Sequence, residues 1–230
     1  MRSKLAKLAF VAAIGLVLAL TFSCSGGDEG GNGNSFEYGS FLYQDKTYKT
    51  IKIGDQVWMA ENLNYDVSGS KCYDDDPANC AKYGRLYAWV TAMALPDSCN
   101  HSSCSIGASH QGICPSGWHI SSDDEWTTLK NFVGTNPVTK LKSTSDWSYN
   151  GNGKDTYGFA ALPSGYAGGF NGPGSDKWFS GVGISGGWWT ASEYENLFVY
   201  VWSMIYGNEN FIREDYSKDY NLYSIRCVQN

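Results

Sequence analysis

CPSGWHISSDDEWTTLKNFVG, residues 114–134, is the stretch of sequence that decides the fold. Ser122 stands three residues before Glu125, the spacing of a capping box, in which the two side chains satisfy backbone N–H groups at a helix start. Gly134 is a favoured residue just past a helix end. The large apolar residues between them fall on one helical face: Trp126, Leu129 and Val133. The stretch therefore predicts an amphipathic helix that is entered through a Pro-Ser-Gly turn.

Upstream of this helix, the pattern predicts short strands and one further helix. Residues 41–57 are rich in Thr, Ile, Val, Tyr and Trp, and turn signals at 45–46 and 54–55 divide them into strands. Apolar residues at helical spacing then predict a helix over residues 87–95, which Pro96 ends.

Downstream, from Lys142 to the end, the sequence carries almost no helix signal. Glycine is frequent over residues 151–187, and Trp and Tyr are scattered among the glycines. Strands are expected around a turn at residues 207–210, and their ranges are 198–206, from 211 onward, and 222–228. The expected fold class is therefore α+β, with two short helices, small antiparallel sheets and long loops rich in glycine and aromatic residues.

The first 23 residues predict a secretory signal. A basic start precedes the uncharged apolar run 8–20, and Cys24 stands at the expected cut point. This placement is typical of a bacterial lipoprotein, in which Cys24 becomes the lipidated first residue; an ordinary signal peptide is the alternative. Residues 24–40, rich in Gly and Asn, then predict a flexible tether, and residues 41–230 a single domain. We expect an exported protein, lipid-anchored at the outer membrane or cell surface.

The charge balance argues against a nucleic-acid partner. Removal of residues 1–23 would delete three basic residues and no acidic ones, which leaves 14 Lys and Arg against 23 Asp and Glu, a formal charge of −9. Nucleic-acid binding depends on a basic surface that neutralises phosphates.

Six cysteines remain beyond Cys24, and an even number in an exported chain predicts disulfides. Six cysteines allow 15 pairings, so the sequence alone does not fix their connectivity. Spacing favours two local pairs and one long-range pair: Cys72–Cys80, Cys99–Cys104 and Cys114–Cys227. Zinc is the rival interpretation for one crowded group, but export and the lack of CxxC or HxxxH spacing disfavour it: Cys99, His101, Cys104, His110 and Cys114.

Seven blocks then occur in order along the chain: TYKTIKIGDQVWMAENLNY, KYGRLYAW, CPSGWHISSDDEW, KLKSTSDW, GNGKDTYGFAALPSGY, WWTASE and YSIRCV. Together they resemble the Fibrobacter succinogenes major paralogous domain, over about residues 43–228. The resemblance implies an exported and often lipid-anchored protein. More distantly, GWHISSDDEWTTL and YSIRCV look like the helix entry and final strand of formylglycine-generating-enzyme domains. That likeness implies a C-type-lectin-like fold and carries no function with it.

The sequence offers no convincing catalytic set, and we expect no enzyme. The formylglycine enzymes need two late cysteines for copper chemistry, whereas Cys227 stands alone late in this chain. GISGG, residues 183–187, matches G-x-S-x-G around Ser185, but no helix signal and no histidine follow it. His119 is expected to pack and to hydrogen-bond, since the sequence identifies no catalytic partner for it.

Two oxygen-rich stretches are weak calcium candidates. Asn150, Asn152 and Asp155 offer oxygen atoms of the kind that calcium prefers, and residues 74–76 form a second acidic run. Both patterns more often mark polar turns. The tripeptides by which sugar-binding C-type lectins hold calcium are absent from the sequence. No metal is therefore predicted as a required cofactor, and calcium is the one candidate.

Aromatic residues in or beside the loops of the second half suggest a binding surface. Flat rings can stack on the apolar faces of sugars, while nearby Asn and Glu side chains bond hydroxyl groups. This group includes Trp178, Trp188, Trp189, Tyr194, Tyr206 and Tyr216. Trp188 and Trp189 favour core packing over ligand contact. Trp178 and the turn after Tyr206 are the better candidates, because turns at sheet ends often carry function. The candidate ligand residues are Trp178, Tyr206, Asn208, Glu209, Asn210, Trp188 and Trp189.

These observations predict a non-catalytic, surface-anchored lipoprotein that binds a glycan or another extracellular polymer. The alternative is a structural or protein–protein module for adhesion or assembly of the cell envelope, and an enzyme of the sulfatase-modifying type is least favoured. The expected partners are the membrane, through the lipid at Cys24, and a polysaccharide or an envelope protein.

Overall fold

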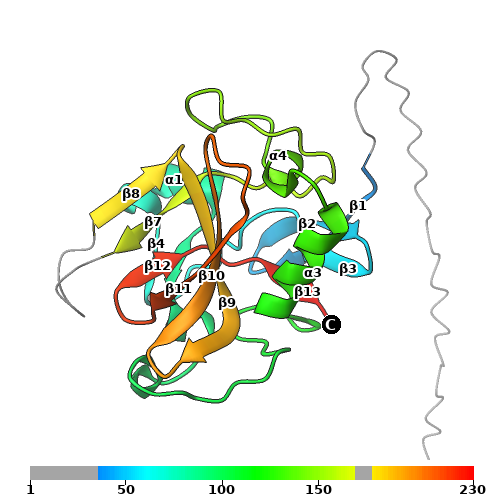
Figure 1. Cartoon of the computed structure of the whole chain (residues 1–230). Coiled ribbons are helices and arrows are strands. Elements are labelled where there is room, and N and C mark those ends of the chain that lie inside the picture. Colours follow the sequence, from blue (N-terminus) through cyan, green and yellow to red (C-terminus); the bar gives the residue numbers. More distant parts are fainter. Residues whose placement is uncertain (1–35, 169–177) are drawn as a thin grey trace, which may run out of the picture. The chain divides into compact units, whose positions relative to one another are not determined.

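The structure is a computed structural model that describes residues 36–168 and 178–230 (Figure 1). The predicted signal peptide, the lipidation site Cys24 and the tether up to residue 35 lie outside the described residues. Residues Asn34–Asn230 form one compact unit. Within the ranges that are described, no helix has the length and apolar character needed to cross a membrane.

A five-stranded antiparallel sheet joins the start of the domain to its last strand, in the order β1-β2-β3-β13-β6. Its strands are β1 Tyr38–Tyr43, β2 Lys46–Ile53, β3 Gln56–Met59, β6 Trp118–Ile120 and β13 Cys227–Gln229. The strands predicted over residues 41–57 are therefore confirmed. The first of them begins at Tyr38, inside the segment predicted as tether, where it pairs with Ile51 of β2.

An eight-stranded sheet carries most of the second half, in the order β11-β10-β9-β7-β12-β5-β4, with β8 paired to β7. Its strands are β4 Ser70–Lys71, β5 Leu86–Ala88, β7 Ser164–Gly168, β8 Trp178–Val182, β9 Ser185–Glu195, β10 Phe198–Ile205, β11 Ile212–Ser217 and β12 Asn221–Tyr223. The predicted hairpin around residues 207–210 is confirmed as β10 and β11. The prediction of a single strand over residues 222–228 is wrong, because this segment forms two strands, β12 and β13, which belong to different sheets.

The helices are short, and the clearest prediction among them is confirmed. Helix α3, Asp123–Val133, begins with a complete capping box: Ser122 Oγ accepts from the Glu125 N–H at 3.3 Å, and Glu125 Oε2 accepts from the Ser122 N–H at 2.8 Å. The other helical segments are α1 Pro77–Tyr83, α2 Trp89–Ala92, α4 Pro137–Leu141 and two 3-10 turns, Tyr73–Asp75 and Asp97–Asn100. The fold is thus mixed α+β as expected, and the described residues contain four short α-helices rather than two.

The helix predicted over residues 87–95 is wrong in length. Leu86–Ala88 forms strand β5, where Tyr87 pairs with Tyr223 and Ala88 with Leu222 of β12. Helix α2 covers Trp89–Ala92 alone. The competing sheet hydrogen bonds outweigh the local helical preference of an Ala-rich segment.

Three disulfides stabilise the domain in the pairing that the spacing favoured: Cys72–Cys80, Cys99–Cys104 and Cys114–Cys227. The zinc interpretation is wrong, because three of its five ligands are used in these bonds. Cys114–Cys227 ties the turn before β6 to β13 across a sequence separation of 113 residues. In the chain-entropy model a closed loop of that length adds about 5 kcal/mol.

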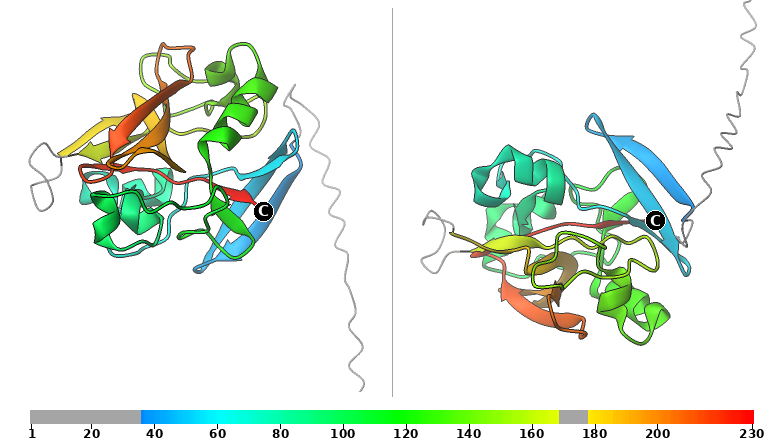
Figure 2. Two further views of the ribbon diagram at one scale, coloured as in Figure 1. Left: turned by 60° about the horizontal axis from the view of Figure 1, so that its bottom comes forward. Right: turned by 90° about the horizontal axis from the view of Figure 1, so that it is seen from above.

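Two cores lie on opposite faces of strands β9 and β10. Trp189 and Val201 belong to one core, together with Trp89 and Tyr223, whereas Trp188 belongs to the other. The apolar face of α3 covers that second core, and the C-terminal segment runs through the middle of the molecule in both views of Figure 2. Strands β9 and β10 are therefore interior to the fold for most of their length.

Candidate functional site

Trp188 and Trp189 are core residues, which excludes them as ligand contacts in this structure. Both are completely buried. The indole N–H of Trp188 donates to Asn62 Oδ1 at 2.8 Å, and that of Trp189 donates to the Tyr87 carbonyl at 2.8 Å. Successive side chains of a strand point to opposite faces, and a core covers each face of β9 here. Trp188 and Trp189 are therefore both buried, although they point in opposite directions.

The β10–β11 turn holds the other predicted residues at the surface. Tyr206 is 38% exposed, and its ring lies 5.0 Å from that of Tyr149, which is 75% exposed. Asn208 Oδ1 accepts from the Asn210 N–H at 2.8 Å, and Glu209 accepts the Thr139 hydroxyl at 2.7 Å. These two polar side chains therefore hold the turn in place.

Trp178 is separated from this turn. It begins β8, where it pairs with Gly168, whereas Tyr206 contacts the turn beyond the other end of β8 through its N–H and the Ile184 carbonyl at 2.8 Å. The structure thus divides the predicted ligand residues into a core pair, a surface turn and a tryptophan at a different edge.

The calcium candidates lie in one loop, where their oxygens hold the backbone. Asn152 Oδ1 accepts from the Trp147 N–H at 3.0 Å, and Asp155 Oδ1 accepts from the Ala160 N–H at 2.8 Å. Asn150 adopts a left-handed backbone conformation with φ 58°. Within residues 36–168 and 178–230, no three His, Cys, Asp or Glu side chains gather as a metal site. These contacts agree with the polar-turn interpretation.

His119 is 4% exposed and lies between two partners. Its Nε2 lies 2.8 Å from Glu125 Oε1, and its Nδ1 lies 2.6 Å from Asn230 Oδ1. The hydrogen bond to Glu125 raises the pKa of His119 above its ordinary value, although burial opposes the shift. Burial alone would raise the pKa of Glu125, but hydrogen bonds from His119 and Ser122 lower it overall. His119 is therefore a packing and hydrogen-bonding residue, as expected.

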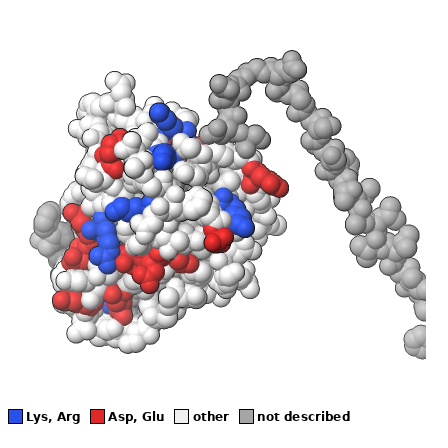
Figure 3. Space-filling view, turned by 45° about the vertical axis from the view of Figure 1, so that its right-hand side comes forward, with Lys and Arg blue, Asp and Glu red and all other residues white. Residues whose placement is uncertain are grey.

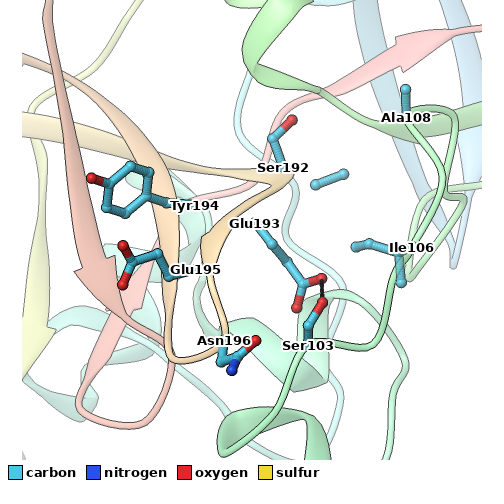
Figure 4. A pocket seen from close by; sticks show the side chains of 9 residues that line it. Ser103, Ile106, Ala108, Ser192, Glu193, Tyr194, Glu195 and Asn196 are labelled. Atoms are coloured by element: carbon cyan, nitrogen blue, oxygen red, sulfur yellow. Dashed lines mark hydrogen bonds between the residues drawn. The ribbon is translucent and has the colours of Figure 1, made fainter.

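An open cleft of about 500 Å³ lies between the end of β9 and the segment that includes Ser103 (Figure 4). Figure 4 shows the Glu193 side chain pointing into this cleft toward Ser103, while Tyr194 and Glu195 lie on the other side of the strand. Glu193 accepts the Ser103 hydroxyl at 2.7 Å and the N–H groups of Cys104 and Ser105 at 3.2 Å. Its carboxylate therefore accepts hydrogen bonds from the disulfide loop, the segment closed by Cys99–Cys104 and the residue after it.

A buried lysine completes that arrangement. Lys218 is 0% exposed and donates to Glu193 Oε1 at 2.5 Å. It also donates to the carbonyls of Cys99, Ser102 and Asn196. Burial would raise the pKa of Glu193, but the hydrogen bonds from Lys218 and Ser103 lower it overall. The cleft is a structural junction whose half-buried acid, Glu193, is held by Lys218 and by the segment Ser103–Ser105.

A smaller cavity of about 200 Å³ opens on one face of the eight-stranded sheet. Its walls are the side chains of Tyr166 on β7, Tyr216 on β11 and Tyr223 on β12. Its floor is Gly186 and Gly187 of β9. We call it the tyrosine pocket.

The glycines of β9 make this cavity. Side chains alternate along a strand, so Gly187 and Trp189 share one face of β9. They pair with Ser203 and Val201 of β10. At Trp189 the face is closed by a large ring, but at Gly187 it carries no side chain. A Cβ at Gly187 would lie 2.7 Å from Tyr223 Cδ1, so the tyrosine ring occupies part of the space that a side chain would need.

The three tyrosines form a continuous aromatic corner. The rings of Tyr166 and Tyr223 stack at 5.7 Å with an interplanar angle of 26°, and those of Tyr216 and Tyr223 meet at 5.4 Å and 58°. Tyr223 is 5% exposed, whereas the other two are half-buried. Trp178, which is 41% exposed, packs edge-on against Tyr166 at 5.7 Å and extends the corner outward.

Polar groups stand beside the corner. Glu214 is exposed on β11, and its Oε2 accepts the Tyr216 hydroxyl at 2.9 Å. Burial and then the Glu214 carboxylate raise the pKa of Tyr216 to about 12, and burial raises the pKa of Tyr223 as well. Both phenols therefore stay protonated at neutral pH. Ser185 and Ser203 add hydroxyl groups to the lining.

Sequence reasoning found the edge of this pocket and missed its centre. Trp178 and Tyr216 were among the aromatic residues singled out, but Tyr166, Tyr223 and Glu214 were not. The available signal was the glycine pair directly before Trp188 in a predicted β region, since glycine inside a strand often marks a close approach or a gap.

Comparison with known proteins places the pocket inside one family match. A model of the Fibrobacter succinogenes major domain matches residues 51–229, which include every residue of the tyrosine pocket. No curated protein and no solved structure matches the chain.

Proposed function

The chain belongs to the Fibrobacter succinogenes major domain family, and we propose that it is a non-catalytic binding protein whose tyrosine pocket takes one sugar unit of a glycan. One observation carries the proposal: a half-open aromatic corner stands beside hydroxyl groups and a carboxylate. Sugar rings have apolar faces that pack against aromatic rings, and their hydroxyl groups need hydrogen-bond partners.

The size and setting of the pocket support a small ligand unit. Its volume of about 200 Å³ lies below the roughly 300–1,000 Å³ of sites for drug-sized molecules. The walls stand on paired strands and not on loops, so the binding geometry is fixed before the ligand arrives, which reduces the entropy lost on binding. A single ring or branch sugar of a larger polymer fits these conditions.

The candidates for catalysis have structural partners, which supports a binding role. His119 contacts Glu125 and Asn230, and Glu193 is held by Lys218 and the disulfide loop. A nucleophile-and-base pair needs mutual contact between the two groups. The hydrogen bonds found for Ser185 include one to the Gly181 carbonyl at 3.4 Å and none to a histidine within the described part of the chain.

The location that we propose follows from the predicted signal. A lipid at Cys24 and the predicted Gly-rich tether before β1 would hold the domain at the outer membrane or cell surface, where extracellular polymers are reached. On the face shown in Figure 3, basic side chains are interrupted by acidic ones, which fits a glycan better than a nucleic acid.

Glycan binding by the full chain, purified with its disulfides intact, tests the proposal. Wild type, Tyr216→Ala and Trp178→Ala would be compared on a broad array of soluble glycans and cellulose, with Tyr149→Ala as the control outside the pocket. We expect at least one glycan whose affinity falls about tenfold on loss of Tyr216, less on loss of Trp178, and not in the control. An array without any retained glycan, or equal binding by Tyr216→Ala, would overturn the proposal.

An adhesion or assembly module is the second candidate, and one observation favours it. Strand β1 is the edge of the five-stranded sheet, and Leu42 on it is 72% exposed. An exposed edge strand with an apolar side chain suits pairing with a strand of another protein. A stoichiometric envelope protein captured by wild type and lost with Leu42→Lys, without any glycan affinity, would support this function over the first.

A further inference from the structure

The charge of the tyrosine pocket bears on which sugar it takes. Among its described lining residues, Glu214 is the only charged one. The neighbouring Arg213 points to the opposite face of the sheet, where it donates to Asp123 Oδ1 and Oδ2 at 2.7 and 2.8 Å. Glu214 accepts a hydrogen bond from the Tyr216 hydroxyl, which is neutral. The carboxylate therefore gives the pocket a negative charge that the described lining residues do not balance.

The aromatic corner adds to this preference. The face of a tyrosine ring carries negative electrostatic potential and attracts a cation placed above it. Tyr166 and Tyr216 are half-buried and expose part of their surfaces to the cavity beside Glu214. A positively charged group in the pocket would gain from both features, whereas a carboxylate or sulfate would meet like charge.

We propose that the tyrosine pocket selects sugars that carry a protonated amino group and rejects acidic sugars. This inference rests on the proposed function of the pocket. The amine contacts Glu214 and the tyrosine faces, while Ser185 and Ser203 serve the hydroxyl groups of the same ring. A sugar fits better than a simple alkylammonium ion because the pocket offers these hydroxyl groups in addition to its rings.

Matched monosaccharides test the selection. Glucose, galactose and mannose would each be presented on a multivalent carrier in three forms, namely the neutral hexose, the 2-amino sugar and the uronic acid. The full chain with intact disulfides is the probe, and multivalency brings weak single-site binding into the measurable range. We expect at least one amino sugar to bind about tenfold more tightly than its neutral form, and its uronic acid not to bind.

Two variants assign the selection to one carboxylate. Glu214→Gln keeps the size and the acceptor for the Tyr216 hydroxyl, so we expect it to lose most of the amine preference and to keep neutral-sugar binding. Asp215→Asn removes an exposed carboxylate on the same strand, outside the pocket lining, and is expected to leave the amine preference unchanged. Choline, a simple alkylammonium ion, would be added as a competitor for carrier binding. If it competes as strongly as the free amino sugar does, the assignment of the ligand to a sugar is overturned.

The two proposals fail in different ways. Neutral and amino sugars that bind equally, or an amine preference that survives in Glu214→Gln, would overturn the selection while the binding function stands. Absence of binding to all nine carriers, together with no effect of Tyr216→Ala on the glycan array, would overturn the binding function itself and the selection with it.

Discussion

Strand β9 presents two regions on one face of the same sheet, one closed and one open. At Trp189 the face is sealed by a buried indole that packs edge-on against Tyr223 at 4.8 Å. Two residues earlier, Gly187 leaves the face bare, and the tyrosine pocket opens there. The comparison shows that the candidate site is made by the absence of side chains on a rigid strand.

The largest expected difference between the regions is in stability. Trp189→Ala removes a completely buried ring and should lower the free energy of unfolding by about 3–5 kcal/mol. Tyr216→Ala, in the half-buried wall of the open region, should cost about 1–2 kcal/mol. Urea unfolding of both variants, with Tyr149→Ala as an exposed control, measures the difference. Equal losses for Trp189→Ala and Tyr216→Ala would show that the two regions are packed alike.

A smaller effect is expected from closing the open region. In Gly187→Ala the new Cβ would lie 2.7 and 3.0 Å from two atoms of the Tyr223 ring, so that ring must shift. Overpacking of this kind should cost about 1–3 kcal/mol and should weaken glycan binding by narrowing the pocket. Ser203→Ala, directly opposite on β10, is the matched control and should keep its stability within about 0.5 kcal/mol. Unchanged binding by folded Gly187→Ala would place the ligand elsewhere.

The smallest expected effect concerns pH and the His119–Glu125 pair, which lies outside the tyrosine pocket. The raised pKa of His119 stabilises the fold below 6.5, and this contribution is lost as pH rises through the folded-state pKa. The lowered pKa of Glu125 stabilises the fold above 4.5, and this contribution is lost as pH falls through its folded-state pKa. The pair should therefore contribute most between those two values, on the order of 1 kcal/mol.

Thermal unfolding of wild type and His119→Gln across pH 4 to 9 measures this effect. The gap between them should be widest between the ordinary pKa values of Glu125 and His119, 4.5 and 6.5, and should narrow toward pH 9. Glycan binding by the open region should follow no such profile, because neither residue lines the pocket. A gap that is constant with pH would show that His119 contributes by packing alone.

Local signals predicted the parts of the fold that depend on neighbours in sequence. The capping box of Ser122 and Glu125 fixed the start of α3, and the turn at Gly207 separated β10 from β11. The disulfides also have the pairing that the spacing favoured, although the sequence alone left 15 pairings open. The helix expected over residues 87–95 failed because the partner of Tyr87, residue Tyr223, lies far along the chain, and local propensity contains no information on such pairing.

The candidate site was harder to predict from the sequence for the same reason. Tyr166, Tyr216 and Tyr223 come from three strands of one sheet, β7, β11 and β12, and the ring of Tyr223 contacts the other two rings only in the folded sheet. Exposure was also invisible in the sequence: Trp188 and Trp189 have the composition of a binding surface but are buried. Whether a tryptophan pair in a strand belongs to the core or to a binding surface depends on which elements pack on each face of the strand.

The division of the last strand has a consequence for the order of folding. β12 enters the eight-stranded sheet and β13 the five-stranded one, and both follow all the other described strands in the chain. Neither sheet is complete, and Cys114 has no disulfide partner, until this segment has been synthesised. Contacts of such long sequence separation form slowly, because loop closure must precede them. A chain that stops before Asn221 would leave unpaired strand edges in both sheets, so we expect truncated copies to be removed by proteases.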